Sequence, residues 1–258
     1  MRVEAGRALV ADPDAQSTPL WPVGRSAAPR TAPVVAGERL PLALELRAVS
    51  KRWSRKQHPV LNNIDLRVSQ GTAILLTGCN GVGKTTLLRV ASGLIAPDSG
   101  GVQVHGLCPE RSRREFHRRV ALLSPGGSGL YARVSVRGHL DLAGRLALLA
   151  RRERAAATEC ALDDFDLRDL AGARVDRLSM GQRQRVRVAM AFLHDPKLVL
   201  LDEPSTSLDD LGIALLHSAV SRLVASGGAA IWCEPADSRS GFSFDRHLLL
   251  EDGALHAA

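Results

Sequence analysis

Residues 78–85, GCNGVGKT, constrain the fold of this chain more than any other stretch. They fit the pattern G-x-x-x-x-G-K-[ST], follow the apolar run TAILLT and precede a helical pattern that begins at Lys84. Small residues let such a loop curl so that its N–H groups point inward at phosphate oxygens, and the helix N-terminus adds the positive end of its dipole. The stretch therefore predicts a buried strand, a phosphate-binding loop and a helix in succession.

The side chains of this loop predict its chemistry. Lys84 supplies a mobile cation for the β- and γ-phosphates of a nucleotide, and the Thr85 hydroxyl is a suitable ligand for Mg²⁺. A glycine-rich turn that binds nothing has no use for Lys-Thr at this offset. The predicted nucleotide-binding residues are Gly78, Cys79, Asn80, Gly81, Val82, Gly83, Lys84, Thr85 and Thr86.

A second motif, KLVLLDEP at 197–204, predicts the other half of the site. Its apolar residues favour a buried strand that delivers Asp202 and Glu203 to the edge where ligands bind in parallel α/β sheets. Asp202 is expected to hold the Mg²⁺ shell, and Glu203 to orient or deprotonate the attacking water. Glu203 and Lys84 are the predicted catalytic residues. An isolated Asp-Glu pair is more often a solvated strand end, but beside a phosphate loop it indicates a P-loop nucleoside triphosphatase.

Strands alternate with helices from Leu42 onwards, which predicts a mainly parallel sheet. A helical pattern at 135–171 predicts an inserted helical subdomain at about 127–177. Residues 1–41 are rich in Pro, Ala, Arg and Thr without a sustained period, which favours a disordered leader before a nucleotide-binding domain at 42–258. Strands are expected at 42–49, 64–71, 72–78, 100–106, 120–124, 197–201 and 229–233, helices at 84–93, 183–194 and 209–225, and a hairpin at 246–256 that turns on Asp252-Gly253.

Three further motifs indicate which kind of P-loop nucleoside triphosphatase this chain resembles. LSMGQRQR at 178–185 resembles the LSGGQ signature of ABC (ATP-binding cassette) ATPases, STSLD at 205–209 resembles their D-loop, and VSKRW at 49–53 resembles the segment whose aromatic residue stacks on adenine. The resemblance covers residues 42–258. It implies an ABC-type α/β fold, with a mainly parallel core sheet, an antiparallel β subdomain and an inserted α-helical subdomain, and it implies ATP and Mg²⁺ as cofactors.

The resemblance also implies roles for single residues. Trp53 is the expected adenine contact, although such a residue by itself is more often a core aromatic. Ser179, Gly181 and Gln182 are expected to cover the γ-phosphate held by a second cassette, although a serine there also suits a simple helix N-cap. Asp209 belongs to the D-loop. Because this chain carries one cassette, it is expected to pair with an identical or related one across a two-fold interface.

Most cassettes of this family drive transport. The resemblance implies an ATP-binding and hydrolysing subunit that powers an ABC transporter, with export favoured, by ATP-driven dimer closure. An integral membrane subunit is then a partner, and the chain lies at the cytoplasmic side of the cell membrane. The stretch TGCNGVGKTTLLRVASGL resembles compact exporter ATPases such as the haem exporter of cytochrome c maturation. Two alternatives stay open: a soluble non-transport ATPase of the iron–sulfur assembly type, and a regulatory cassette with slow hydrolysis.

The composition agrees with a location at the cytoplasmic side of the membrane and argues against a membrane-spanning chain, a metal site and a disulfide framework. No apolar run reaches the length of a membrane span, and four scattered cysteines without a Cys/His cluster favour a reducing compartment over a metal or disulfide framework. The net charge is +7, and arginine contributes far more of the positive charge than lysine does. A GC-rich coding sequence also produces such an excess of arginine. Basic runs such as 111–119 suit solvated helix faces. Nucleic acid is therefore not an expected partner.

Three positions depart from the family pattern. Gly126 stands where the family has a glutamine that helps to place Mg²⁺ and water, and Met180 replaces a glycine of the signature. Pro235 falls at the position of a histidine that contacts the γ-phosphate, with Glu234 just before it. Proline has no N–H donor, and an ionised glutamate would repel phosphate. We therefore predict that this chain binds Mg-ATP but hydrolyses it slowly.

Overall fold

The computed structural model describes residues 41–54, 58–126, 129–236 and 241–258. The disordered leader predicted at residues 1–41 lies outside this part of the chain except for Pro41. Each helix in the described part is too short or too polar to cross a membrane.

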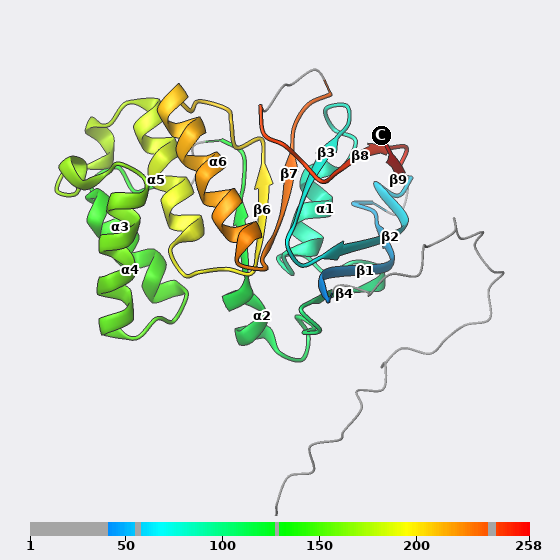
Figure 1. Ribbon diagram of the computed structural model, residues 1–258. Coiled ribbons are helices and arrows are strands. Elements are labelled where there is room, and N and C mark those ends of the chain that lie inside the picture. The colour runs from blue at the N-terminus through cyan, green and yellow to red at the C-terminus, as the bar shows by residue number, and fades with distance from the viewer. Residues whose placement is uncertain (1–40, 55–57, 127–128, 237–240) are drawn as a thin grey trace, which may run out of the picture. The chain divides into compact units, whose positions relative to one another are not determined.

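A mainly parallel sheet forms the core of the described residues (Figure 1). Its strands are β3 (Thr72–Thr77), β5 (Val120–Leu123), β6 (Leu198–Asp202), β7 (Ala229–Cys233), β8 (Arg246–Glu251) and β9 (Ala254–Ala257). They lie in the order β5-β6-β7-β3-β8-β9, and every pairing is parallel except that of β8 with β9. All residues of β6 and β7 are buried, because strands inside a parallel sheet are covered on both faces.

Helices cover both faces of this sheet, since neighbouring strand residues point to opposite sides. Leu200 packs into the apolar core that contains helix α1 (Lys84–Ala91). Leu201, the next residue, packs into a second core with helices α5 (Met180–Phe192) and α6 (Asp210–Ala225). The sheet is therefore the middle layer of three.

A second, antiparallel sheet lies beside α1. It consists of β1 (Leu42–Lys51), β2 (Leu61–Ser69) and β4 (Ser99–Val104) in the order β2-β1-β4. Gly100 has a φ of +84°, and a Cβ there would lie 2.4 Å from the carbonyl oxygen of Ala48, so the close approach of β4 to β1 requires glycine. The apolar side chains of this sheet share the core of α1.

The remaining helices gather near the β5 edge of the parallel sheet (Figure 1). Helices α3 (Val136–Leu146) and α4 (Arg151–Asp164) pack against each other and against α5. Two short 3-10 turns, Arg168–Leu170 and Val175–Arg177, connect them to α5. Helix α2 (Arg113–Arg119) precedes β5; it buries Phe116 and exposes most of its basic residues, as the sequence indicates for a solvated helix face.

The predicted fold class is confirmed: a parallel core sheet, an antiparallel β subdomain and a helical region are all present. The predicted hairpin also forms, between β8 and β9. Asp252 and Gly253 have φ values of +48° and +75°, as expected of the mirror-image turns that suit the twist of a hairpin. The bounds 127–177 for the helical subdomain and 42–258 for the whole domain stay predictions.

Candidate nucleotide-binding site

The phosphate loop joins β3 to α1, in the order of elements that the sequence predicts. Gly83, the last residue before α1, has a φ of +118°, and a Cβ there would lie 2.6 Å from Cγ1 of Val60. Only glycine meets both conditions without strain. Among the described residues, no side chain caps the start of α1, so the first N–H groups of the helix are available to an anion.

Lys84 lies buried at the centre of this loop. Its Nζ donates hydrogen bonds to the carbonyl oxygens of Gly78, at 2.7 Å, and Cys79, at 3.2 Å. The hydrogen-bond partners that hold the ammonium over the first residues of the loop are therefore neutral. This position suits the role that the sequence predicts for Lys84.

Asp202 ends β6 directly beside the loop and is only 2% exposed. Burial raises the pKa of its carboxyl, whereas a hydrogen bond from Thr85 and the charge of Lys84 lower it. Its Oδ2 is buried without a hydrogen-bond partner among the described residues. A buried carboxylate oxygen needs a partner, and an oxygen pair of this kind fits a hard cation, so Thr85 and Asp202 suit Mg²⁺.

Three carboxylates gather where β6 and β7 end. Asp202 is the last residue of β6, Glu203 follows it, and Glu234 follows β7. Burial raises the pKa of the Cys233 thiol, and all three carboxylates raise it further, while Lys84 lowers it. Negative charge therefore gathers at this edge of the sheet, although no group of three metal-ligating side chains forms among the described residues.

Glu203 has an unusual backbone. Its φ is +49°, in the left-handed region, and its N–H donates to the carbonyl oxygen of Cys233 at 3.0 Å. Glu203 lines a cavity of about 460 Å³ that Gly126 and Met180 also line. Two of the three departures from the family pattern therefore share a cavity with the predicted catalytic carboxylate.

Gly126 leaves open space in that cavity. A Cβ at this position would have no neighbouring heavy atom within 4 Å, although the φ of +80° is unfavourable for a residue with a side chain. A glutamine side chain would thus have room but would strain the backbone.

Trp53 follows β1 and is 53% exposed, so its ring does not belong to the core. The Nζ of Lys51 lies 6.0 Å from the ring centroid and forms an ion pair with Asp98 at 2.8 Å. An exposed flat ring with polar surroundings suits a purine, and the contact of Trp53 with adenine stays a prediction.

The predicted signature residues form the start of α5. Ser179 Oγ accepts a hydrogen bond from the N–H of Gln182 at 3.1 Å, and Gln182 Oε1 accepts one from the N–H of Ser179 at 2.9 Å. In this capping box the side-chain oxygens of Ser179 and Gln182 cap two backbone N–H groups at the start of the helix. A Cβ at Gly181 would lie 3.5 Å from Asp209 Oδ2, so the signature and the predicted D-loop are neighbours. Met180 is 69% exposed beside them.

The role of Glu234 is the feature that sequence reasoning missed. Glu234 is 3% exposed, and its Oε1 accepts hydrogen bonds from Ser205 Oγ at 2.6 Å and from Trp232 Nε1 at 2.7 Å. Pro235, the next residue, is half-buried, and its equivalence to the family histidine stays a prediction. The signal in the sequence is weak, because the bonded residues Ser205 and Glu234 meet only when β6 and β7 pair.

Comparisons with known proteins place these features in a family. The family described as ABC transporter matches residues 61–206. The ABC transporter ATP-binding protein NatA of Bacillus subtilis is 36% identical over 176 residues, which cover 67% of this chain and 72% of NatA. The daunorubicin resistance ATP-binding protein DrrA3 of Streptomyces coeruleorubidus is 39% identical over 220 residues, 83% of this chain and 67% of DrrA3. The Nod factor export ATP-binding protein I of Rhizobium meliloti is 31% identical over 219 residues, 85% of this chain and 64% of that protein.

A solved structure agrees with this placement. The ATP-binding subunit of an ABC transporter superposes with a TM-score of 0.75 at 25% identity, over 83% of this chain and 90% of the other. The family match extends from β2 through the phosphate loop and the signature to the residues after Glu203. The chain therefore belongs to the ABC transporter family, as an ATP-binding subunit that energises transport.

Proposed function

We propose that this chain binds Mg-ATP at the junction of two cassettes and hydrolyses it to drive export through a membrane subunit. The observation that carries the proposal is the meeting of the phosphate loop with the end of β6, where Lys84, Thr85 and Asp202 lie together. Two relatives, a daunorubicin resistance ATP-binding protein and a Nod factor export ATP-binding protein, favour export. The relatives named above are not haem exporters, so the finer likeness to those rests on sequence texture alone.

In this proposal each group of the site has one task. The N–H groups of the loop and of the first turn of α1 bind the phosphates, and Lys84 holds the β- and γ-phosphates. Thr85 and Asp202 would hold Mg²⁺, which supplies charge neutralisation at the phosphates when bound. Glu203 orients the attacking water or accepts its proton, and Trp53 stacks on the adenine.

We also propose that hydrolysis at this site is slow. Gly126 brings no side chain into the cavity beside Glu203, and Pro235 brings no hydrogen-bond donor. The loss of one well-placed polar group typically lowers a rate by about a hundredfold or more. The regulatory cassette is thus the second candidate function.

The second cassette would meet the exposed start of α5. Gly181 lies beside Asp209, and Met180, the residue before it, is exposed to solvent. A nucleotide held by one cassette would then face the helix N-terminus of the other. The partner cassette is an identical or a related chain.

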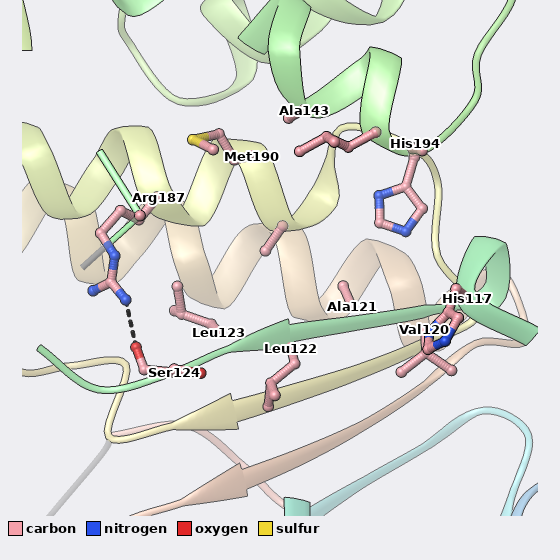
Figure 2. A pocket seen from close by; sticks show the side chains of 14 residues that line it. His117, Val120, Ala121, Leu122, Leu123, Ser124, Ala143, Arg187, Met190 and His194 are labelled. Carbon is pink, nitrogen blue, oxygen red and sulfur yellow. Dashed lines mark hydrogen bonds between the residues drawn. The ribbon is translucent and has the colours of Figure 1, made fainter. Parts of the chain in front are cut away.

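A groove beside the helical region is the proposed contact for the membrane subunit (Figure 2). Its volume is about 460 Å³, and apolar residues of β5, α3 and α5 make up most of its lining. Leu146, at the end of α3, is 75% exposed there, and the basic helix α2 adjoins it. An apolar segment with acidic residues from the membrane subunit fits this combination. The chain would then lie at the cytoplasmic side of the membrane.

A chain of hydrogen bonds runs from this groove to the turn at residues 203–205, which carries Glu203 and is called the catalytic turn below. Figure 2 shows the guanidinium of Arg187 bonded to the carbonyl oxygen of Ser124 at one end of the groove. Arg187 also donates to Gln184 Oε1 at 2.7 Å, and Gln184 Nε2 donates to the carbonyl oxygen of Pro204 at 3.2 Å. A partner bound in the groove would thus act, through these hydrogen bonds, on Pro204, the residue that follows Glu203.

Purification of the native complex from membranes tests the proposal. We expect an integral membrane chain to co-purify with this one, and the substitution Leu146→Glu to reduce its recovery without changing ATP affinity. Leu94→Glu, at another exposed leucine, is the matched control. A soluble scaffold protein in place of a membrane chain would favour the iron–sulfur assembly alternative and contradict the transport proposal.

A further inference from the structure

The catalytic turn after β6 is held in an unfavourable conformation. A residue with a side chain seldom adopts the left-handed region, yet Glu203 has a φ of +49°. Such a conformation persists only where the surrounding structure holds it. The groups that hold this turn therefore control where the Glu203 carboxylate points.

Two consecutive residues at the end of β7 hold the turn on either side of Pro204. The carbonyl oxygen of Cys233 accepts the N–H of Glu203 at 3.0 Å. The carboxylate of Glu234 accepts the hydroxyl of Ser205 at 2.6 Å. The first bond belongs to the backbone and is open to any residue at 233, whereas the second depends on the side chains of Glu234 and Ser205.

Glu234 is itself held both at its backbone and at its carboxylate. Its N–H donates to the carbonyl oxygen of Leu76, at the end of β3, at 3.1 Å. The indole N–H of Trp232 donates to the same carboxylate oxygen that Ser205 reaches, at 2.7 Å. Trp232 is fully buried, stacked on Phe242 and in edge contact with Phe244. These contacts hold the carboxylate in a position where it meets Ser205.

We propose that Glu234 is a positioning residue for ATP hydrolysis, which acts by holding Ser205 and, through it, the backbone of Glu203. This inference rests on the proposed hydrolytic function. Glu234 stands at the end of the strand that leads to Pro235, and it contributes to catalysis from there without a contact to phosphate. A buried acceptor that binds two neutral donors keeps its geometry whether or not the γ-phosphate is present.

The test compares Glu234→Ala with Glu234→Gln in steady-state ATPase assays of the full chain. Alanine removes the acceptor, so we expect kcat to fall by roughly tenfold or more while KM for ATP stays within about twofold. Glutamine keeps an oxygen acceptor of the same shape and is expected to recover most of the rate. Glu110→Ala, at an exposed glutamate, is the matched control.

Ser205→Ala removes the same bond from the other side, so it tests the proposal even if Glu234→Ala fails to fold. We expect a similar fall in kcat, and a double variant no slower than the slower single variant, because both changes break one interaction. Fully multiplied effects in the double variant would contradict the proposal. So would a raised KM with unchanged kcat in Glu234→Ala or Ser205→Ala.

Hydrogen exchange separates this inference from the proposed function. The N–H groups of Thr206 and Leu208 donate to the carbonyl oxygens of Glu203 and Ser205. We expect these amides to exchange faster in Glu234→Ala than in Glu234→Gln or Glu110→Ala, irrespective of any ATPase activity. Unchanged exchange together with unchanged kcat would overturn the role of Glu234. If Glu203→Gln hydrolyses ATP at the parent rate, the proposed hydrolytic role of Glu203 fails instead.

Discussion

At the scale of single residues, Lys84 has the clearest consequence. It is the buried cation of the phosphate loop, and its partners in the structure are two neutral carbonyl oxygens. A phosphate that binds to Lys84 therefore does not compete with a carboxylate that is hydrogen-bonded to the ammonium.

The substitution Lys84→Ala should abolish tight ATP binding, because the loop loses its mobile cation. Titration calorimetry with Mg-ATP is expected to show at least about a hundredfold weaker binding, which corresponds to about 2.7 kcal/mol. Lys197→Ala, in a surface ion pair with Asp195, serves as the control and should bind as the parent does. Undiminished affinity in Lys84→Ala would show that the nucleotide binds elsewhere.

Glu203→Gln should keep ATP binding and slow hydrolysis, since glutamine retains the shape of the side chain but cannot accept a proton from water. The measurement is a single-turnover assay beside a binding titration. A rate equal to that of the parent would contradict the catalytic role of Glu203.

Gly126→Gln and Pro235→His test whether these positions limit the rate. Each restores a polar group, so we expect kcat to rise, most in the double variant. The gain from Gly126→Gln should be the smaller one, because glutamine is strained at a φ of +80°. A fast parent enzyme whose rate neither change affects would rule out the proposed slow turnover.

At the scale of elements, β6 connects folding to function. Its five residues are all buried, its side chains alternate between the two apolar cores, and its last residue is Asp202. The position of the candidate Mg²⁺ ligand therefore depends on the packing of the strand that carries it.

Leu200→Ala should lower the free energy of unfolding by about 2–5 kcal/mol, because it leaves a cavity in a closely packed core. Urea denaturation followed by circular dichroism measures the change. Leu211→Ala, at a half-exposed leucine in α6, should change it by about 0.5 kcal/mol at most. Equal effects at the two positions would show that β6 is not the packed centre of the sheet.

At the scale of the whole molecule, the signature and the phosphate loop require a partner. Ser179 and Gln182 cap the start of α5 with their oxygen atoms, so the Ser179 hydroxyl proton and the exposed start of the helix are left for a second nucleotide. Each proposed ATP site therefore needs the phosphate loop of one chain and the signature of a second chain.

Glu203→Gln should form a dimer when Mg-ATP is added, because ATP binds both surfaces and is not consumed. Light scattering after size-exclusion chromatography is expected to show a doubled mass that returns to the monomer value when Lys84→Ala is added to the same chain. A monomer at saturating ATP would mean that this cassette pairs with a different chain.

The sequence alone determined the phosphate loop, the Asp202–Glu203 strand end and the strand–helix order, because each depends on neighbours along the chain. A glycine that needs a left-handed backbone, an apolar run with a carboxylate at its end and an Asp-Gly hairpin turn are local signals. These signals were sufficient for the fold class.

The tertiary structure alone decided which side chains meet across the sheet. Glu234 reads in the sequence as a charge that would repel phosphate, whereas the pairing of β6 with β7 brings it to Ser205. Arg187 belongs to none of the sequence motifs, whereas packing buries it between Ser124 and Gln184. Contacts of this kind join residues that are far apart in the sequence. Their geometry depends on the order of the strands and on side-chain packing, and the local sequence pattern predicts neither.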